Sequence, residues 1–151
     1  MCGRFHATEA QMAKVIYTAK ADVTGGREQG HGATDDGVLD IQLRPPGDGG
    51  GTNPEQLFAV GYAACFEGAI GAVGRRERLE VGDVSIASSV SLITTEDRGF
   101  NIAAELDVTL PQLQADDAER IVRAAHEVCP YSNATRGNIE VKLKANGRAL
   151  D

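Results

Sequence analysis

The chain has 151 residues, the size of one domain with a substantial buried core. Its 15 basic and 22 acidic residues give a formal net charge of −7 and a pI near 4.9. This balance, with one short basic run at Arg75, Arg76 and Arg78, argues against sequence-independent binding to nucleic acid or to anionic membranes. We interpret that run as the solvated end of a helix.

The N-terminal stretch is polar and has no continuous apolar segment of the kind that secretory signals need. We therefore expect a cytoplasmic protein with a flexible arm over residues 1–12 and a single domain over residues 13–151. The cysteines are Cys2, Cys65 and Cys129. An odd number in a reducing compartment argues against a structural disulfide framework, so any pair would be a working redox pair. We interpret Cys2 as an incidental exposed thiol.

The first third of the chain predicts a β-hairpin. Residues 14–23 are rich in β-forming side chains and predict a strand. Residues 24–32 predict a glycine-rich turn that carries Arg27. Residues 37–43 alternate between apolar and polar side chains, predict a second strand that pairs with the first, and are stopped by Pro45 and Pro46.

A central helix is predicted from Asn53 to Gly74. Asn53 is a favoured N-cap, and Pro54 suits the first helical position. The segment is apolar nearly all round, which indicates a buried helix. A membrane span needs roughly 17–25 apolar residues, and this run is short and contains Glu67. A face of small residues favours close packing on a second helix, or on a second copy of this one.

The remaining chain predicts two strands, a helix and a last strand. Residues 84–92 predict a strand with an irregularity at 87–89, and residues 100–110 alternate without a break. A helix over 115–128 presents one apolar face and is stopped by Pro130. The alternation over 139–143 predicts the last strand. The order β-β-α-β-β-α-β indicates an α+β fold.

The candidate chemistry lies in the two cysteines of the predicted helices. If the helices pack together, Cys65 and Cys129 could meet, although a cysteine on an apolar helix face also serves as a small buried hydrophobe. A reactive thiolate needs a nearby cation, for which Arg27 is the candidate beside its interpretation as a solvated turn residue. Glu55 is either a capping-box partner of Thr52 or a carboxylate that holds the Arg27 guanidinium.

Other chemistries are disfavoured by missing residues. His126 and Cys129 are spaced to share a zinc ion, but nothing completes four ligands, so His126 is interpreted as a core or boundary histidine. The glycines at 47–51 lack the ending of a phosphate-binding loop, and no nucleophile-elbow motif of a serine hydrolase is present.

Three segments closely resemble the organic hydroperoxide resistance proteins (Ohr) of the OsmC superfamily. They are Asn53–Phe58 with Gly61–Phe66, Val128–Asn138, and the turn Thr24–Arg27. The likeness spans roughly residues 12–145. It implies an OsmC/Ohr-like α+β fold in which two core helices pack with antiparallel sheets in an intertwined homodimer.

The resemblance also implies an activity: a thiol-dependent peroxidase for alkyl and fatty acid hydroperoxides, with no cofactor. By the same likeness Cys65 is the peroxidatic cysteine, Cys129 the resolving cysteine, Arg27 the thiolate activator and Glu55 its orienting partner. The reductant implied is dihydrolipoamide or a lipoylated protein. Phe58 and Phe66 are candidates to favour an alkyl group, beside their interpretation as core residues, and Glu28 is a possible competitor for Arg27.

Two alternatives stay open from the sequence. One is a non-catalytic redox sensor or apolar-ligand binder on the same fold, which would oxidise once and stop. The other is a broader OsmC-type enzyme with a different peroxide preference. We expect no partnership with nucleic acid or membrane under any of these hypotheses.

Overall fold

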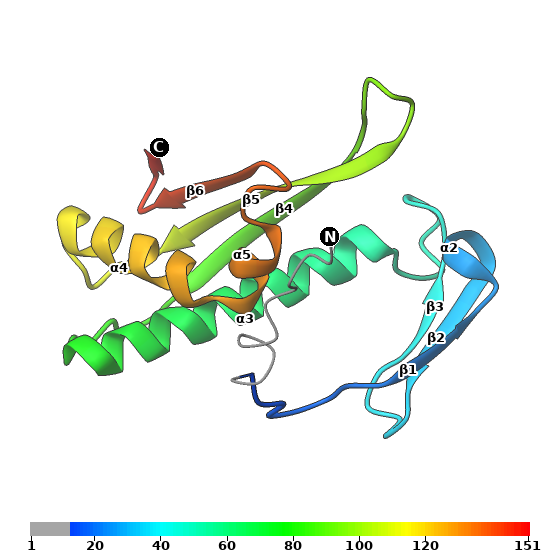
Figure 1. Cartoon of the computed structure of the whole chain (residues 1–151), viewed down its shortest axis with the longest axis horizontal. Coiled ribbons are helices and arrows are strands. Elements are labelled where there is room, and N and C mark those ends of the chain that lie inside the picture. The colour runs from blue at the N-terminus through cyan, green and yellow to red at the C-terminus, as the bar shows by residue number, and fades with distance from the viewer. Residues whose placement is uncertain (1–12) are drawn as a thin grey trace, which may run out of the picture. The chain divides into compact units, whose positions relative to one another are not determined.

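A computed structural model describes residues 13–151 (Figure 1). The predicted arm over 1–12, with Cys2, lies outside these residues. The chain divides after Thr52 into two compact units, and each has its own β-sheet. The single domain predicted over 13–151 stays a prediction. The α+β class expected from the sequence is confirmed.

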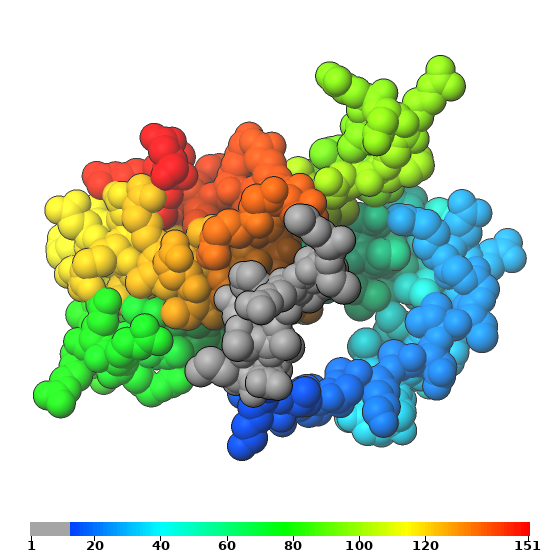
Figure 2. All heavy atoms as spheres, viewed as in Figure 1, coloured from blue at the N-terminus to red at the C-terminus, as the bar shows by residue number. Residues whose placement is uncertain are grey.

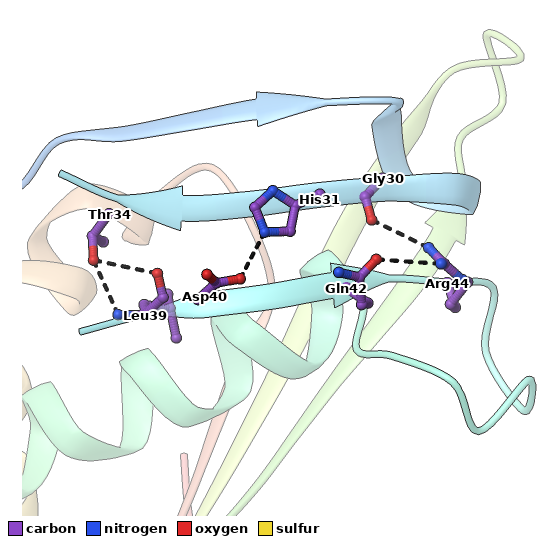
Figure 3. A network of polar contacts seen from close by, with 7 residues as sticks. All are labelled: Gly30, His31, Thr34, Leu39, Asp40, Gln42 and Arg44. Carbon is purple, nitrogen blue, oxygen red and sulfur yellow. Dashed lines mark hydrogen bonds and ion pairs between the residues drawn. The ribbon is translucent and has the colours of Figure 1, made fainter. Parts of the chain in front are cut away.

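The first unit is a three-stranded antiparallel sheet with a one-turn helix. The strands are β1 (Ala21–Thr24), β2 (Gly30–Thr34) and β3 (Asp40–Leu43), and they pair in that order. Helix α2 (Gly26–Gln29) forms the connection from β1 to β2. Side chains also join β2 to β3, because His31 Nε2 lies 2.6 Å from Asp40 Oδ1 (Figure 3).

The predicted two-stranded hairpin is wrong in its pairing, since β3 pairs with β2 and not with β1. Strand β2 lies where a turn was predicted, because Gly30 and Gly32 contribute no side chains to an alternating pattern. The strand predicted over 14–23 forms only from Ala21 onward. Residues 13–20 have no regular secondary structure, and their apolar side chains are exposed, Ile16 to 95%. β-Forming side chains favour a strand mainly where they are buried against a neighbour.

The second unit packs its helices on a four-stranded sheet. The sheet order is β4 (Ser85–Thr94), β5 (Phe100–Thr109), β6 (Val141–Ala145) and β7 (Arg148–Leu150). Helices α3 (Pro54–Glu77) and α4 (Ala115–Val128) lie side by side and contact β4 and β6, and α5 (Pro130–Thr135) follows α4 (Figure 1). Because α4 and α5 carry the chain back across the sheet, β5 and β6 run parallel. The expected antiparallel sheet is therefore mixed.

Helix α3 begins where the sequence predicted. Asn53 is the N-cap, its Oδ1 accepts from the Gln56 N–H at 2.9 Å, and Pro54 takes the first helical position. The cap is thus Asn53 and not Thr52. One face of α3 is buried with the apolar faces of α4, β5 and β6. The largest fully buried apolar side chains of this core are Tyr62, Phe66, Ile70, Leu106, Leu110 and Ile121.

The other boundaries of the second unit are confirmed or corrected by the pairing. The helix predicted over 115–128 has these bounds, and β5 matches its alternating pattern. Strand β4 pairs with β5 over ten consecutive residues, so the predicted irregularity at 87–89 is wrong. Pro130 ends α4 but also opens α5, which was not predicted, and neither was β7. The tip of the β4–β5 hairpin projects beyond the rest of its unit, as Figure 2 shows in yellow-green.

Helix α3 is long and apolar enough to cross a membrane by length and composition alone. One such helix is weak evidence, because the core helix of a soluble protein passes the same test. Here α3 buries Tyr62, Phe66, Ile70 and Val73 in the core of its unit. This packing agrees with the interpretation as a core helix.

Candidate active site

The peroxidatic candidate, Cys65, lies in the middle of α3. It shares a face of the helix with Phe58 and Tyr62, since these residues stand seven and three positions before it. The Cys65 side chain is partly exposed and packs against the edge of the core. Cys65 therefore lies at the boundary of the core and not inside it.

The second candidate, Cys129, lies at the junction between α4 and α5 rather than inside a helix. It is both the C-cap of α4 and the N-cap of α5, with an extended backbone conformation (ψ 124°). Pro130 enforces this break, because the residue before a proline avoids the helical conformation. The Cys129 side chain is fully buried.

The junction brings the two sulfurs together. Cys129 Sγ lies 3.6 Å from Cys65 Sγ, and both residues are free thiols. The expectation that the two thiols meet across 64 residues of sequence is confirmed. A disulfide bond of ~2.05 Å requires them to approach by only about 1.5 Å more.

The neighbourhood raises the pKa of the Cys65 thiol. Burial is the largest cause, because it disfavours the charged thiolate, and the adjoining Cys129 thiol raises the pKa further. The backbone N–H of Tyr131, in the first turn of α5, acts in the opposite direction by donating to the sulfur. Together these groups favour the protonated thiol over the thiolate.

An aromatic side chain packs on α3 one turn before Cys65. The Tyr131 ring lies 5.6 Å from the rings of both Phe58 and Tyr62, and 37% of the residue is exposed. Gly61 permits this approach, because a Cβ there would lie 2.8 Å from the Tyr131 hydroxyl oxygen. Phe66 is fully buried in the core, so of the two phenylalanines considered for substrate contact only Phe58 borders this surface.

A buried polar chain lies behind the cysteines. Ser132 Oγ is 2.9 Å from the Tyr62 hydroxyl and 2.9 Å from His126 Nδ1. The Thr135 hydroxyl donates to the Tyr131 carbonyl at 2.8 Å. His126 is thus a partnered boundary histidine, as expected, and burial lowers its pKa. Sequence reasoning missed this chain, although a tyrosine in an apolar helix and a serine after Cys-Pro are polar groups that need partners when buried.

Arg27 lies in α2 of the first unit, in a turn held by backbone geometry. Gly25 has a φ of 75°, and a Cβ on Gly30 would fall 1.9 Å from the Gly26 carbonyl oxygen. The Arg44 guanidinium donates to the Gly30 carbonyl at 3.2 Å, which ties the end of this turn to the end of β3 (Figure 3). It also donates to the Leu43 carbonyl at 2.7 Å. The backbone conformation of α2 is therefore fixed by its flanking glycines and by these hydrogen bonds.

Glu55 lies in the first turn of α3, in the second unit. Its expected ion pair with Arg27, and the contact of Arg27 with Cys65, would each join the two units. Both stay predictions.

Within residues 13–151, no group of three histidine, cysteine, aspartate or glutamate side chains is placed to hold a metal ion. His126 Nδ1 contacts Ser132. The chemistry that this arrangement supports is that of two adjacent thiols.

The comparisons with known proteins point to one family. Residues 47–144 match the family model described as OsmC-like protein. An organic hydroperoxide resistance protein of Xanthomonas axonopodis pv. citri is 51% identical over 140 residues, which cover 89% of this chain and 97% of that protein. The organic hydroperoxide resistance protein OhrB of Bacillus subtilis is 49% identical over 134 residues, covering 85% and 97%.

Solved structures agree. The crystal structure of Bacillus subtilis OhrB has a TM-score of 0.81 at 48% identity and covers 86% of this chain and 98% of that one. An organic hydroperoxide resistance protein from Legionella pneumophila has a TM-score of 0.81 at 50% identity, covering 87% and 98%.

Proposed function

This chain belongs to the OsmC family, among its organic hydroperoxide resistance proteins, and from this we propose that it is a thiol-dependent peroxidase for organic hydroperoxides. The observation that carries the proposal is the sulfur pair. A partly exposed Cys65 lies 3.6 Å from a fully buried Cys129. A sulfur that a peroxide can reach, with a protected thiol beside it, is the arrangement that such a cycle needs.

The cycle has two chemical steps before reduction. The Cys65 thiolate attacks the distal oxygen of a hydroperoxide ROOH, the O–O bond breaks, and the alkoxide leaves as the alcohol ROH after taking a proton. Cys65 is thereby oxidised to a sulfenic acid. The Cys129 sulfur then attacks Cys65, its thiol proton leaves with the hydroxide as water, and a disulfide forms.

Arg27 is the proposed activator. The groups around Cys65 in its own unit raise the pKa of the thiol, so a guanidinium is needed to stabilise the thiolate. The same guanidinium would donate to the peroxide oxygen on which charge builds as the O–O bond breaks. We assign Glu55 the role of orienting Arg27 through a charge-assisted hydrogen bond.

The class of substrate and the class of reductant are proposed from the residues that surround Cys65 and from the burial of Cys129. Phe58 and the half-exposed Tyr131 supply an aromatic surface next to Cys65, which favours an alkyl or fatty acid hydroperoxide over hydrogen peroxide. Because Cys129 is fully buried, a reductant must exchange first at Cys65. A small dithiol on a flexible arm suits this access, so we propose lipoyl groups, free or on a protein, as the reductant in the cytoplasm.

We also propose that the protein works as a homodimer. On α3, Val60, Ala64 and Gly68 form an exposed face of apolar and small residues opposite the core side. A second copy of α3 would cover it. Sedimentation should give a mass twice the 15.9 kDa of the chain, and a monomer at micromolar concentration would contradict the assembly.

The deciding experiment is steady-state consumption of cumene hydroperoxide with dihydrolipoamide as reductant. Wild type should turn over repeatedly, Cys65→Ser should be inactive, and Cys129→Ser should react once without being recycled through the disulfide. A thioredoxin system and hydrogen peroxide run in parallel test the preferences for reductant and substrate. A single oxidation of folded, reduced protein without turnover would replace the enzyme by a redox sensor, and a preference for hydrogen peroxide would indicate a different OsmC-type activity.

A further inference from the structure

We propose that the hydrogen-bonded chain of Tyr62, Ser132 and His126 is a positioning device that holds the Cys129 sulfur against Cys65. We assign none of the three a contact with the substrate or a part in the bonds that form and break. They act through the placement of the α4–α5 junction. The inference rests on the proposed function in one respect: it takes the oxidised state of the protein to be the Cys65–Cys129 disulfide.

The chain joins the same two segments as the sulfur pair. Tyr62 precedes Cys65 by three residues, nearly one turn of α3, and Ser132 follows Cys129 by three residues. The Tyr62 hydroxyl lies 2.9 Å from Ser132 Oγ, so a hydrogen bond runs beside the 3.6 Å sulfur contact and connects the same backbones. His126, in the last turn of α4, ties the other side of the junction to Ser132 at 2.9 Å.

Burial makes this chain decisive for the local geometry. Tyr62 and Ser132 are fully buried, and a buried hydroxyl without a partner costs more than a hydrogen bond gains. Two proton arrangements satisfy these links. Tyr62 donates to Ser132 and Ser132 donates to the neutral His126 Nδ1, or His126 Nδ1–H donates to Ser132 and Ser132 donates to Tyr62, which then donates to Thr135 Oγ1 at 3.4 Å. Thr135 donates separately to the Tyr131 carbonyl and fixes the first turn of α5.

The hydrogen bonds of Ser132 also set the position of Tyr131, the residue before it. The backbone N–H of Tyr131 donates to the Cys65 sulfur, and its ring packs on Phe58. Ser132 is the next residue, so the position of its hydroxyl sets the position of that N–H. If the chain is cut, we expect the junction to sample positions in which Cys129 and the Tyr131 N–H lie farther from Cys65.

The step at stake is the formation of the disulfide. The Cys129 sulfur bonds to the Cys65 sulfur, the S–O bond of the sulfenic acid breaks, and the hydroxide leaves with the Cys129 proton as water. A second organic hydroperoxide competes for the same sulfenic acid and oxidises it irreversibly to a sulfinic acid. Proximity determines which reaction is faster.

The first test measures disulfide stability without peroxide. Tyr62→Phe and Ser132→Ala are oxidised with diamide and equilibrated with dithiothreitol, which exchanges one protein disulfide for its own. We expect the equilibrium constant for protein disulfide formation to fall by roughly tenfold, because one buried hydrogen bond is lost. Tyr17→Phe and Ser89→Ala make the same atomic changes at exposed positions and should leave it unchanged.

The second test separates positioning from general stability. In stopped-flow experiments with cumene hydroperoxide, formation of the sulfenic acid should stay within about twofold of wild type in Ser132→Ala. The later formation of the disulfide should slow about tenfold, and mass spectrometry should find more sulfinic acid at Cys65. A variant that melts earlier but keeps both the exchange equilibrium and the resolution rate of wild type would overturn the proposal.

His126 provides a rescue experiment. Asparagine places an acceptor close to the position of Nδ1, whereas leucine has a similar size and no polar atom. We expect His126→Asn to resemble wild type and His126→Leu to resemble Ser132→Ala in dithiothreitol exchange. Equal behaviour of the two variants would refute a role for the polar link. If no variant or wild type consumes peroxide, the proposed function fails, and the exchange equilibrium still decides the positioning role.

Discussion

The two units hold their predicted site residues by different means. In the first unit, Arg27 stands on a one-turn helix whose shape comes from the backbone: glycines at 25 and 30, and carbonyls bound by Arg44. In the second unit, Cys65 and Cys129 are held by side chains that fill a core, with a buried polar chain beside them. One part is built on main-chain geometry and the other on packing.

The two parts should therefore be sensitive to different kinds of substitution. A backbone-determined turn tolerates changes of side chain at its surface but fails where a Cβ has no room. A packed core tolerates little change in volume or in polar partners. The two units also differ in chemistry. The second unit supplies two adjacent thiols, but its packing raises the pKa of Cys65. We propose that Arg27 of the other unit lowers that pKa.

We expect the largest effect on the peroxide reaction from removing the Arg27 guanidinium. In Arg27→Ala we expect the pKa of Cys65 to lie above the ordinary value for a thiol, because burial, the largest cause of the shift, then acts without a cation. The rate of reaction with cumene hydroperoxide should fall on the order of 100-fold at neutral pH. The pH dependence of Cys65 alkylation, with Cys2 and Cys129 replaced by serine, measures the pKa.

Arg76→Ala is the control for charge. It removes one guanidinium from the exposed last turn of α3 and should leave both the pKa and the rate as in wild type. If Arg27→Ala reacted at the wild-type rate, activation by Arg27 would be wrong.

A substitution of Gly30 tests the backbone origin of the Arg27 turn. A Cβ at this position would lie 1.9 Å from the Gly26 carbonyl oxygen, so α2 must move in Gly30→Ala. We expect the peroxide reaction to slow about tenfold and the free energy of unfolding to fall by ~2 kcal/mol. Rapid kinetics and denaturant unfolding followed by circular dichroism measure these effects.

Gly32→Ala is a matched control in the same strand. The added Cβ would meet Val23 Cγ2 at 3.4 Å, which is ordinary contact. Kinetics and stability close to wild type are therefore expected. Equal losses in the two variants would show that β2 is sensitive to any side chain and that the turn has no special role.

The second unit was largely predictable because its elements carry side-chain patterns. The apolar face of residues 115–128 predicted α4, and the alternation from Phe100 predicted β5. An Asn-Pro start predicted α3. The meeting of Cys65 and Cys129 followed from two core helices that pack together, although the extended break at Cys129 did not. A proline that ends one helix also begins the next.

The first unit was poorly predictable because pairing, and not pattern, determines its strands. Gly30 and Gly32 leave β2 without an apolar alternation, and only its neighbours β1 and β3 show that it is a strand. Val15 and Ile16 are residue types with high β-propensity, so they predicted a strand. That propensity reflects packing against buried neighbours, and in this chain both side chains are exposed. The Tyr62–Ser132 bond was equally hidden, since 70 residues separate its ends.

The smallest effect should come from the protonation of His126, and it tests the packed side of the comparison. Burial, followed by the charge of Arg136, lowers the pKa of His126, whereas Glu127 acts to raise it. A lowered pKa in the folded state means that folding favours the neutral ring. Its contribution to stability is present above the ordinary histidine pKa near 6.5 and is lost as the pH falls through the lower folded value. The ring is only half-buried, so the loss should be modest.

His126→Asn keeps an acceptor for Ser132 but cannot titrate. Between pH 7.5 and 5, we therefore expect its melting temperature to fall less than that of wild type in matched thermal scans. His31→Asn changes a histidine of the first unit that contacts Asp40 and controls for any general effect of losing an imidazole. A variant that lost stability with acid as steeply as wild type would show that His126 does not report on the junction. The polar chain would then be as insensitive to acid as the apolar core around it.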